Sequence, residues 1–445
     1  MIIANALPIK TIAMNKKWLK ELPCCFLFLF LLIIAFLVTH VPEPEYDIDP
    51  SYILFGVSRP PLYPLFIWLF HYQFTLIMWV QGFFLFSALL YARYWMMKKL
   101  QVSDFSIFLV LLCVLFTIAF HFQIRFIQSE GLAFPLFIYS FFLLIECFWK
   151  FDLKKIVYLA VIVSLLVLTR LQFYYDYIIF ILLCFRYVGQ RIPIKSIMLA
   201  ATILFGSMGL TTFIDHGYHY IKHGFFGAAP YSGLMILVQT LYLADNSSVQ
   251  YVSNPVEKHL LENMLNQRNS QHLNLDASLV TSMKPSYLQH AYQEYSRNYL
   301  AIQDVIGKVL QTSVENQNGV GTSLQANQIA LNMNSVLISH ELKKNLVFLL
   351  WKFVACMGGV PVFLFFLLLL FSLSFKMFKR DGKNSIDLAF LAIIPIVTFL
   401  NAAIIAVCNP DLPVYFCYSQ FMLYCLAAFL ATKVGFKSSL LIALK

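Results

Sequence analysis

Two carboxylates and one arginine in a short polar stretch are the residues with the clearest capacity for chemistry. Asp47 and Asp49 lie two positions apart, and Arg59 follows them directly before Pro60-Pro61. A carboxylate can act as a general base, which typically accelerates a reaction by about 10²–10⁴. Arginine stays charged at any relevant pH and can hold two phosphate oxygens at once. The two prolines fix an extended backbone and would hold Arg59 at the start of the next segment.

The composition indicates that this stretch belongs to a membrane protein. Of 445 residues, 60% are hydrophobic and only 12% are charged, whereas about a quarter of the residues in a soluble globular protein are charged. The net charge of +10 arises from basic residues between apolar runs, a pattern of membrane topology that argues against nucleic-acid binding. The nine cysteines show no CxxC and no paired His/Cys spacing, which argues against a structural zinc site or a disulfide scaffold. We therefore expect an all-α polytopic membrane protein and chemistry on a lipid-linked phosphate.

Ten segments are apolar enough to predict membrane spans. They are residues 24–41, 74–95, 104–120, 129–149, 156–169, 172–186, 197–214, 346–375, 386–408 and 412–432. The first is predicted to be an uncleaved span because it lacks a small-x-small cleavage site. Basic residues flank the region 156–186 at both ends, so it should cross twice or re-enter, with Arg170 at the tip of a short hairpin. Gly358-Gly359 and Pro361 should kink the eighth span.

The positive-inside rule predicts the topology. Most Lys and Arg residues of the short loops and tails fall on one side of these ten spans, which predicts cytoplasmic termini in a bacterial inner or plasma membrane. The long segment between the seventh and eighth spans is then extracytoplasmic. Apolar residues recur with helical spacing at 255–267 and 287–310, whereas 311–326 has two glycines and predicts a flexible strap. The predicted divisions are 1–214 with a catalytic first outer loop at 41–73, a helical domain at 215–345, and a second membrane module at 346–445.

Charged residues gather at the outer ends of the predicted spans. They are Asp47, Asp49, Arg59, Arg125, Glu130, Arg170, Asp176 and Asp411. A charge at mid-bilayer costs about 2.5–3.5 kcal/mol on insertion scales, so any one of these charges could simply mark a helix end. Three arginines and several acids on one face of a protein with short loops favour a shared site instead.

Three roles are open for Asp49. It could be the base that takes a proton from an acceptor hydroxyl, with Asp47 in reserve. It could cap a helix, because Asp-Pro-Ser is a good helix start with Pro at the first position. A divalent cation shared by Asp47 and Asp49 is a third role that these residue types allow. The segment 62–72 is too short to span, and its aromatic residues predict a helix lying in the membrane interface.

Three motifs in chain order resemble a known family. They are Asp49-x-x-Tyr52 followed by Ser58-Arg59-Pro60-Pro61-Leu62-Tyr63-Pro64-Leu65, then Ser129-Glu130-Gly131-Leu132, then Leu168-Thr169-Arg170. This ordered set resembles the first outer loop, the opening of a later span and the L-T-R-P element of the GT-C superfamily. These are integral membrane glycosyltransferases that use polyprenyl-phosphate sugars, including the family 39 protein mannosyltransferases and aminoarabinose transferases. Leu171 stands where the family often has Pro, and Pro413-Val414-Tyr415 where it often has Arg-Tyr.

The resemblance implies a GT-C-like bundle of about ten transmembrane helices with an extracytoplasmic helical insertion. The implied reaction moves a sugar, with inversion, from a polyprenyl-phosphate donor to a lipid, glycan or protein acceptor at the outer membrane face. Asp49 or Asp47 would be the base, and the phosphate-binding residues would be Arg59, Arg125 and Arg170 with Glu130 beside them. A transporter or flippase of lipid-linked glycans is the main alternative, and a glycan polymerase is another. A transporter predicts polar residues near mid-span and repeat symmetry, and the sequence has little of either.

Overall fold

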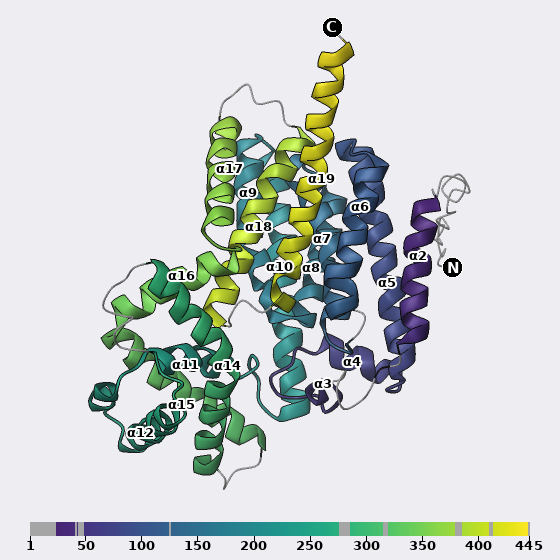
Figure 1. Ribbon diagram of the computed structural model, residues 1–445. Helices are drawn as coiled ribbons and strands as arrows, with labels where there is room; N and C mark the ends of the chain where they lie inside the picture. Colours follow the sequence, from purple (N-terminus) through teal and green to yellow (C-terminus); the bar gives the residue numbers. More distant parts are fainter. Residues whose placement is uncertain are drawn as a thin grey trace.

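The computed structural model describes residues 24–40, 42, 49–123, 126–275, 285–314, 319–378, 385–408 and 413–443. Within these ranges all regular secondary structure is helical and no strand occurs. Figure 1 shows a helical bundle with a second group of helices at one end, the end where α3 and α4 lie. The C-terminal end of α19 lies at the opposite end of the bundle.

In the described part of the chain, ten long or medium helices form the bundle. They are α2 (Cys24–Thr39), α5 (Phe74–Trp95), α6 (Asp104–Val114), α7 (Glu130–Trp149), α8 (Leu153–Thr169), α9 (Asp176–Gly189), α10 (Ile194–His223), α17 (Val360–Phe378), α18 (Ile386–Cys408) and α19 (Pro413–Ala443). Shorter elements continue or connect them: α3 (Pro50–Ile53), α4 (Leu62–Leu69), η1 (Met96–Leu100), η2 (Leu115–Gln123) and η3 (Leu171–Tyr175).

Seven helices of the described chain are long and apolar enough to cross a membrane. They become eight when α16 (Leu342–Cys356) and α17, which pass the same test together, count as one bent span. The chain is therefore an all-α polytopic membrane protein. The other two predicted spans form α2 and α8, which are helices of 16 and 17 residues. That α2 and α8 also cross the membrane, which would give ten spans in all, stays a prediction.

The bend between α16 and α17 confirms the predicted kink. The two helices meet at 83°, and Gly358 and Gly359 have φ angles of +96° and +90°. Only glycine adopts such backbone angles without steric cost, so the two glycines allow the turn. Pro361 follows at the start of α17, where its missing N–H needs no helical partner.

Helix α7 occupies the centre of the bundle. Of the residues in its apolar 18-residue window, 83% are buried inside the structure, against 22% for the corresponding window of α10. Helix α7 packs on α5, α8 and α18. An apolar helix buried on nearly all sides is held rigidly by close packing. Glu130 is its first residue, so this carboxylate is attached to the most firmly packed element of the bundle.

Ion pairs connect the helices at the end of the bundle opposite α3 and α4 (Figure 1). Arg93 Nε lies 2.9 Å from Asp104 Oδ1, and Lys433 Nζ lies 3.0 Å from Asp387 Oδ2. Lys155 pairs with the buried Glu146, which also accepts a 2.8 Å hydrogen bond from Trp95 Nε1. These basic residues belong to the clusters that the positive-inside rule assigns to the cytoplasm.

A second hydrophobic core forms a helical domain at the end of the bundle where α3 and α4 lie, and it is named the outer helical domain after its predicted location. Its elements are α11 (Ser232–Leu243), η4 (Asn246–Tyr251), α12 (Pro255–Ser270), α14 (Pro285–Val314) and α15 (Gly319–His340). Phe348 of α16 joins this core. The helices expected at 255–267 and 287–310 are confirmed as α12 and α14. The expected domain start at 215 lies inside α10, which continues to His223.

The flexible strap predicted at 311–326 is wrong for the residues described. Helix α14 continues to Val314, and α15 already begins at Gly319. Asn327 Oδ1 accepts a 2.9 Å hydrogen bond from Gly233 N, and Asn334 Oδ1 accepts a 2.7 Å bond from Thr240 Oγ1. These contacts with α11 stabilise α15 although its own sequence has weak helix propensity, which tertiary packing can override.

Candidate functional site

Asp49 caps the short helix α3. Its Oδ1 accepts hydrogen bonds from Ser51 N at 2.9 Å and from Ser51 Oγ at 2.6 Å. Pro50 occupies the first helical position, where its missing N–H leaves no donor unpaired. The helix-cap interpretation of Asp49 is therefore confirmed, and one of the two carboxylate oxygens is used for the cap.

Arg59 folds back onto this cap. A turn brings it there, because Gly56 N donates to Ser51 O at 2.7 Å and Arg59 N donates to Gly56 O at 2.9 Å. Arg59 Nη2 forms an ion pair with Asp49 Oδ2, and Arg59 Nε donates to Ser51 Oγ at 2.7 Å. Arg59 Nη1 donates to Tyr52 Oη at 3.3 Å, with the guanidinium carbon 4.5 Å from the Tyr52 ring centroid. All three guanidinium nitrogens thus have a partner.

Arg170 and Glu130 form a second ion pair, and it is buried. Their side chains are only 10% and 5% exposed, whereas those of Arg59 and Asp49 are each 33% exposed. Arg170 follows the last residue of α8, and its Nη1 also donates to Ser129 Oγ at 3.4 Å. Its guanidinium carbon lies 5.0 Å from the ring centroid of Tyr415 at the start of α19. The arginine at the hairpin tip thus contacts two other segments, the start of α7 and the start of α19.

A single hydroxyl contact joins the two ion pairs. Tyr52 Oη and Ser129 Oγ lie 2.8 Å apart, and both are buried. Ser129 Oγ also lies 3.3 Å from Glu130 Oε2. The result is a continuous series of polar contacts, called the polar chain below, through Asp49, Arg59, Tyr52, Ser129, Glu130 and Arg170.

No protein-family model, curated protein or solved structure matches this sequence. The functional assignment therefore rests on the polar chain and on the motifs. Four residues predicted for the site, Asp49, Arg59, Glu130 and Arg170, lie in the polar chain. Asp47, Arg125 and Asp411 lie outside the described residues, and Asp176 is buried at the start of α9.

Aromatic packing fixes the position of Tyr52. Its ring meets the Tyr63 ring edge to face, with centroids 4.9 Å apart. Tyr63 is fully buried in α4, and its Oη accepts a 2.6 Å hydrogen bond from Gln81 Nε2. The Gln81 amide lies against Gly131, where a Cβ atom would overlap it. Glycine at position 131 thus leaves the space in which Gln81 supports Tyr63 and, through it, Tyr52.

A buried asparagine in α18 was not recognised from the sequence. Asn401 Oδ1 accepts a 2.6 Å hydrogen bond from Gln172 Nε2, and Asn401 Nδ2 donates to Tyr415 O at 3.3 Å. An amide inside an apolar membrane helix is costly unless it is paired, and its presence is itself a signal of function. Here the amide positions the backbone of Tyr415, whose ring faces Arg170.

The outer helical domain approaches the polar chain at Tyr231. Tyr231, just before α11, accepts a 2.6 Å hydrogen bond from Gln303 Nε2 of α14. Burial raises the pKa of the Tyr231 hydroxyl, and the nearby positive charge of Arg59 lowers it in part. Tyr231 is therefore close enough to Arg59 to interact with it electrostatically. The outer helical domain can thus contribute Tyr231 to a ligand site at Arg59.

The C-terminal end of α10 supports the loop between α3 and α4. Lys222 Nζ lies 4.4 Å from the Phe55 ring centroid, and the Tyr218 ring centroid lies 6.5 Å from it. Behind this contact Asp215 and His219 are buried, with their nearest ionisable atoms 3.8 Å apart. These two residues were not predicted as site residues. Across the described residues no group of three or more His, Cys, Asp or Glu side chains could hold a metal ion.

Proposed function

We propose that this protein is a GT-C-type glycosyltransferase that moves a sugar from a polyprenyl-phosphate donor to a lipid, glycan or protein acceptor at the extracytoplasmic membrane face. The observation that carries the proposal is the polar chain itself. Residues from the first loop, the start of α7 and the end of α8 meet in one network, although they are far apart in sequence. The three motifs that resemble the GT-C superfamily contribute all six members of that network.

The donor phosphate would bind at Arg59. This guanidinium is the more exposed of the two, and its position beside α4 is near the predicted membrane interface. Two phosphate oxygens can replace the Asp49 and Ser51 oxygens at the guanidinium, because arginine binds carboxylate and phosphate with the same planar geometry. Donor binding would thus separate Asp49 from Arg59.

Release from Arg59 would make Asp49 available as the base. In the absence of donor both of its oxygens are occupied, one by Ser51 and one by Arg59. Once Arg59 holds phosphate, the freed carboxylate oxygen can take the proton of an acceptor hydroxyl. The hydroxyl oxygen then bonds to the anomeric carbon, while the bond from that carbon to the phosphate oxygen breaks. The electron pair leaves with the polyprenyl phosphate, whose charge Arg59 stabilises.

Arg170 would add a second positive charge beneath this site. Glu130 and Ser129 orient its guanidinium, and the ring of Tyr415 faces it. A buried pair of this kind is costly to break, since removing one partner leaves an uncompensated charge. Glu130 and Arg170 therefore act as a fixed support that positions Ser129 and, through it, Tyr52.

The direct experiment is a transfer assay with protein reconstituted in liposomes. A short-chain polyprenyl-phosphate donor labelled in its sugar is supplied from outside, and label is followed into lipid, glycan and protein fractions of a cell-envelope extract. We expect label to move to an acceptor with equimolar release of polyprenyl phosphate, and we expect the Arg59→Ala variant to lose this release. Label that crosses the bilayer while still attached to its carrier would instead identify a flippase.

A further inference from the structure

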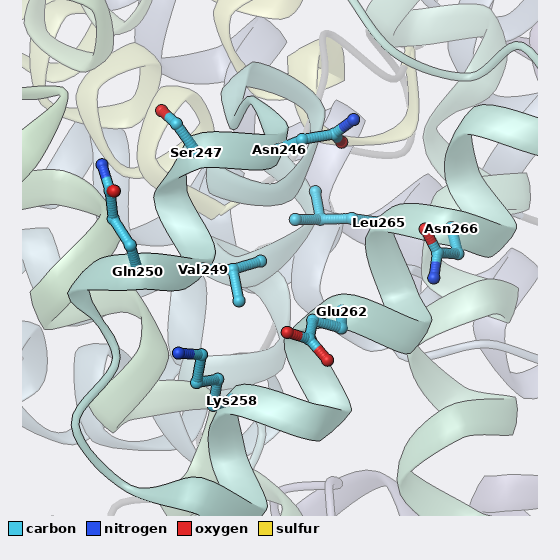
Figure 2. Close-up of a pocket in the computed structure, with 8 residues that line it drawn as sticks. All are labelled: Asn246, Ser247, Val249, Gln250, Lys258, Glu262, Leu265 and Asn266. Carbon is cyan, nitrogen blue, oxygen red and sulfur yellow. The ribbon is translucent and has the colours of Figure 1, made fainter.

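A polar cavity lies in the outer helical domain between η4 and α12. Its volume is about 470 Å³, within the range of about 300–1,000 Å³ that is usual for ligand pockets. Its walls are the side chains of Asn246, Ser247, Val249, Gln250, Lys258, Glu262, Leu265 and Asn266. Figure 2 shows Val249, Leu265, Lys258 and Glu262 around the space between the two helices.

The helical spacing of α12 produces one wall of this cavity. Lys258, Glu262 and Asn266 follow one another at intervals of four residues, so they share one face of the helix. Leu265 is buried between them and, together with Val249 of η4, provides an apolar floor. The cavity thus has a small apolar base and a polar rim.

Four of the rim side chains have unused hydrogen-bonding groups. Gln250, Lys258, Glu262 and Asn266 make no side-chain hydrogen bond or ion pair with the rest of the described chain. Two other lining residues are already occupied, because Asn246 accepts from Asn269 at 2.9 Å and Ser247 donates to Asp245 at 2.5 Å. Gln250, Glu262 and Asn266 are exposed and Lys258 is half-buried, so their free groups face solvent or a ligand that binds in this open cavity.

The chemistry of these groups selects a class of ligand. One lysine and one glutamate balance each other, which disfavours phosphates and other strongly charged molecules. Two carboxamides supply both donors and acceptors, as do the hydroxyl groups of a sugar. The apolar floor of Val249 and Leu265 can contact the C–H face of a sugar ring. We propose that this cavity binds a neutral saccharide of one to three rings.

This saccharide site is separate from the proposed transfer reaction. Its residues come only from η4 and α12, and none belongs to the polar chain. Binding there needs no lipid donor, so it can be measured on its own and can hold even if the protein is not a transferase.

The test uses full-length protein in nanodiscs. The protein is applied to an array of immobilised neutral and acidic saccharides of one to four rings, and the saccharide retained best is then titrated in solution. Wild type should retain neutral saccharides, and the double variant Gln250→Ala/Asn266→Ala should bind about tenfold more weakly because two hydrogen-bonding side chains are lost. The matched control is Gln267→Ala, next along α12 and exposed, and it should bind as wild type does.

Three results would overturn the proposal. Wild type could retain no saccharide above the level of empty nanodiscs. It could retain only acidic saccharides, which would contradict the charge balance of Lys258 and Glu262. The double variant could bind as tightly as wild type, which would place the saccharide elsewhere on the protein.

Discussion

The hydroxyl oxygens of Tyr52 and Ser129 lie 2.8 Å apart, although 77 positions separate the two residues in the sequence. This contact is the only link in the polar chain between the loop carrying Asp49 and Arg59 and the bundle helices carrying Glu130 and Arg170. Tyr52 touches Arg59, and Ser129 touches both Glu130 and Arg170. The geometry of the partly exposed ion pair is thereby connected to that of the buried one.

Removing the Tyr52 hydroxyl should weaken this connection without disturbing the packing. Tyr52→Phe keeps the ring that faces Arg59 and Tyr63, but it loses the two hydrogen bonds of the hydroxyl, with Ser129 and with Arg59, each worth about 0.5–1.5 kcal/mol net. We expect the transfer rate in liposomes to fall about 3- to 10-fold with little change in thermal stability. The matched control is Tyr187→Phe, which loses a buried hydroxyl hydrogen bond to Cys147 O away from the polar chain. Equal rates for the two variants would contradict the role given to Tyr52.

The planar guanidinium group of Arg59, with its paired N–H donors, should be required to bind the phosphate of the sugar donor. Arg59→Lys keeps the charge but loses the paired donors that match a phosphate, and charged hydrogen bonds are worth about 1.5–3 kcal/mol each. The apparent affinity for the labelled donor should therefore fall about 10- to 100-fold, while expression is unchanged. Arg93→Lys is the control, since Arg93 is paired with Asp104 at the opposite end. If Arg59→Ala transfers sugar normally, Arg59 is only a membrane anchor.

Residue types predicted much of the candidate site, but they could not predict which of its side chains pair with one another. Asp49, Arg59, Glu130 and Arg170 stand out because charges are rare and lie at helix ends. The ion pair between Asp49 and Arg59 depends on the turn that closes from Gly56 N to Ser51 O, and no residue pattern specifies that closure. Tyr52 and Ser129 were present in the motifs, but their contact arises only when the loop docks on α7.

The same limit applies to the fold. Apolar runs predicted the bundle helices, and the spacing of apolar residues predicted α12 and α14. Helix α15 was missed because its stability comes from contacts such as Gly233 N to Asn327 Oδ1, which join distant segments. The predicted span ends at residue 214, before the last turns of α10, because the segment that follows is rich in polar residues. In the structure this polar stretch continues the helix beneath Phe55.

Glycine at position 131 should be required for stability. Gly131→Ala would bring a methyl group onto the Gln81 amide and disturb its hydrogen bond to Tyr63. Overpacking of this kind costs about 1–3 kcal/mol. We expect a lower midpoint in detergent-based thermal unfolding. Gly209→Ala is the control, because open space surrounds Gly209 in α10, and alanine there should be neutral or stabilising. Equal midpoints for the two variants would contradict the packing described.

Acid should selectively weaken the cap of η4. Hydrogen bonds from Ser247 lower the pKa of Asp245 below its usual value. A carboxyl with a lowered folded-state pKa stabilises the fold above its unfolded pKa of about 3.9, and this contribution is lost as pH falls through the folded-state value. Asp245→Asn keeps a capping oxygen but does not titrate. Wild type should therefore have the higher unfolding midpoint at pH 7, and the difference should be smaller at pH 3, below the unfolded pKa. A difference of equal size at both pH values would contradict this assignment.

The central claim is that donor phosphate takes Arg59 from Asp49 and thereby frees the base. The measurement that tests it most directly combines equilibrium binding of a polyprenyl phosphate with sugar transfer, for wild type and Asp49→Asn. Asparagine caps a helix as well as aspartate does, so α3 should persist, and Asp152→Asn at the cap of α8 is the matched control. We predict that Asp49→Asn binds polyprenyl phosphate severalfold more tightly than wild type, because no carboxylate competes for Arg59, and that its transfer is abolished. An Asp49→Asn protein that transfers sugar at the wild-type rate, or that binds the phosphate more weakly, would contradict the account.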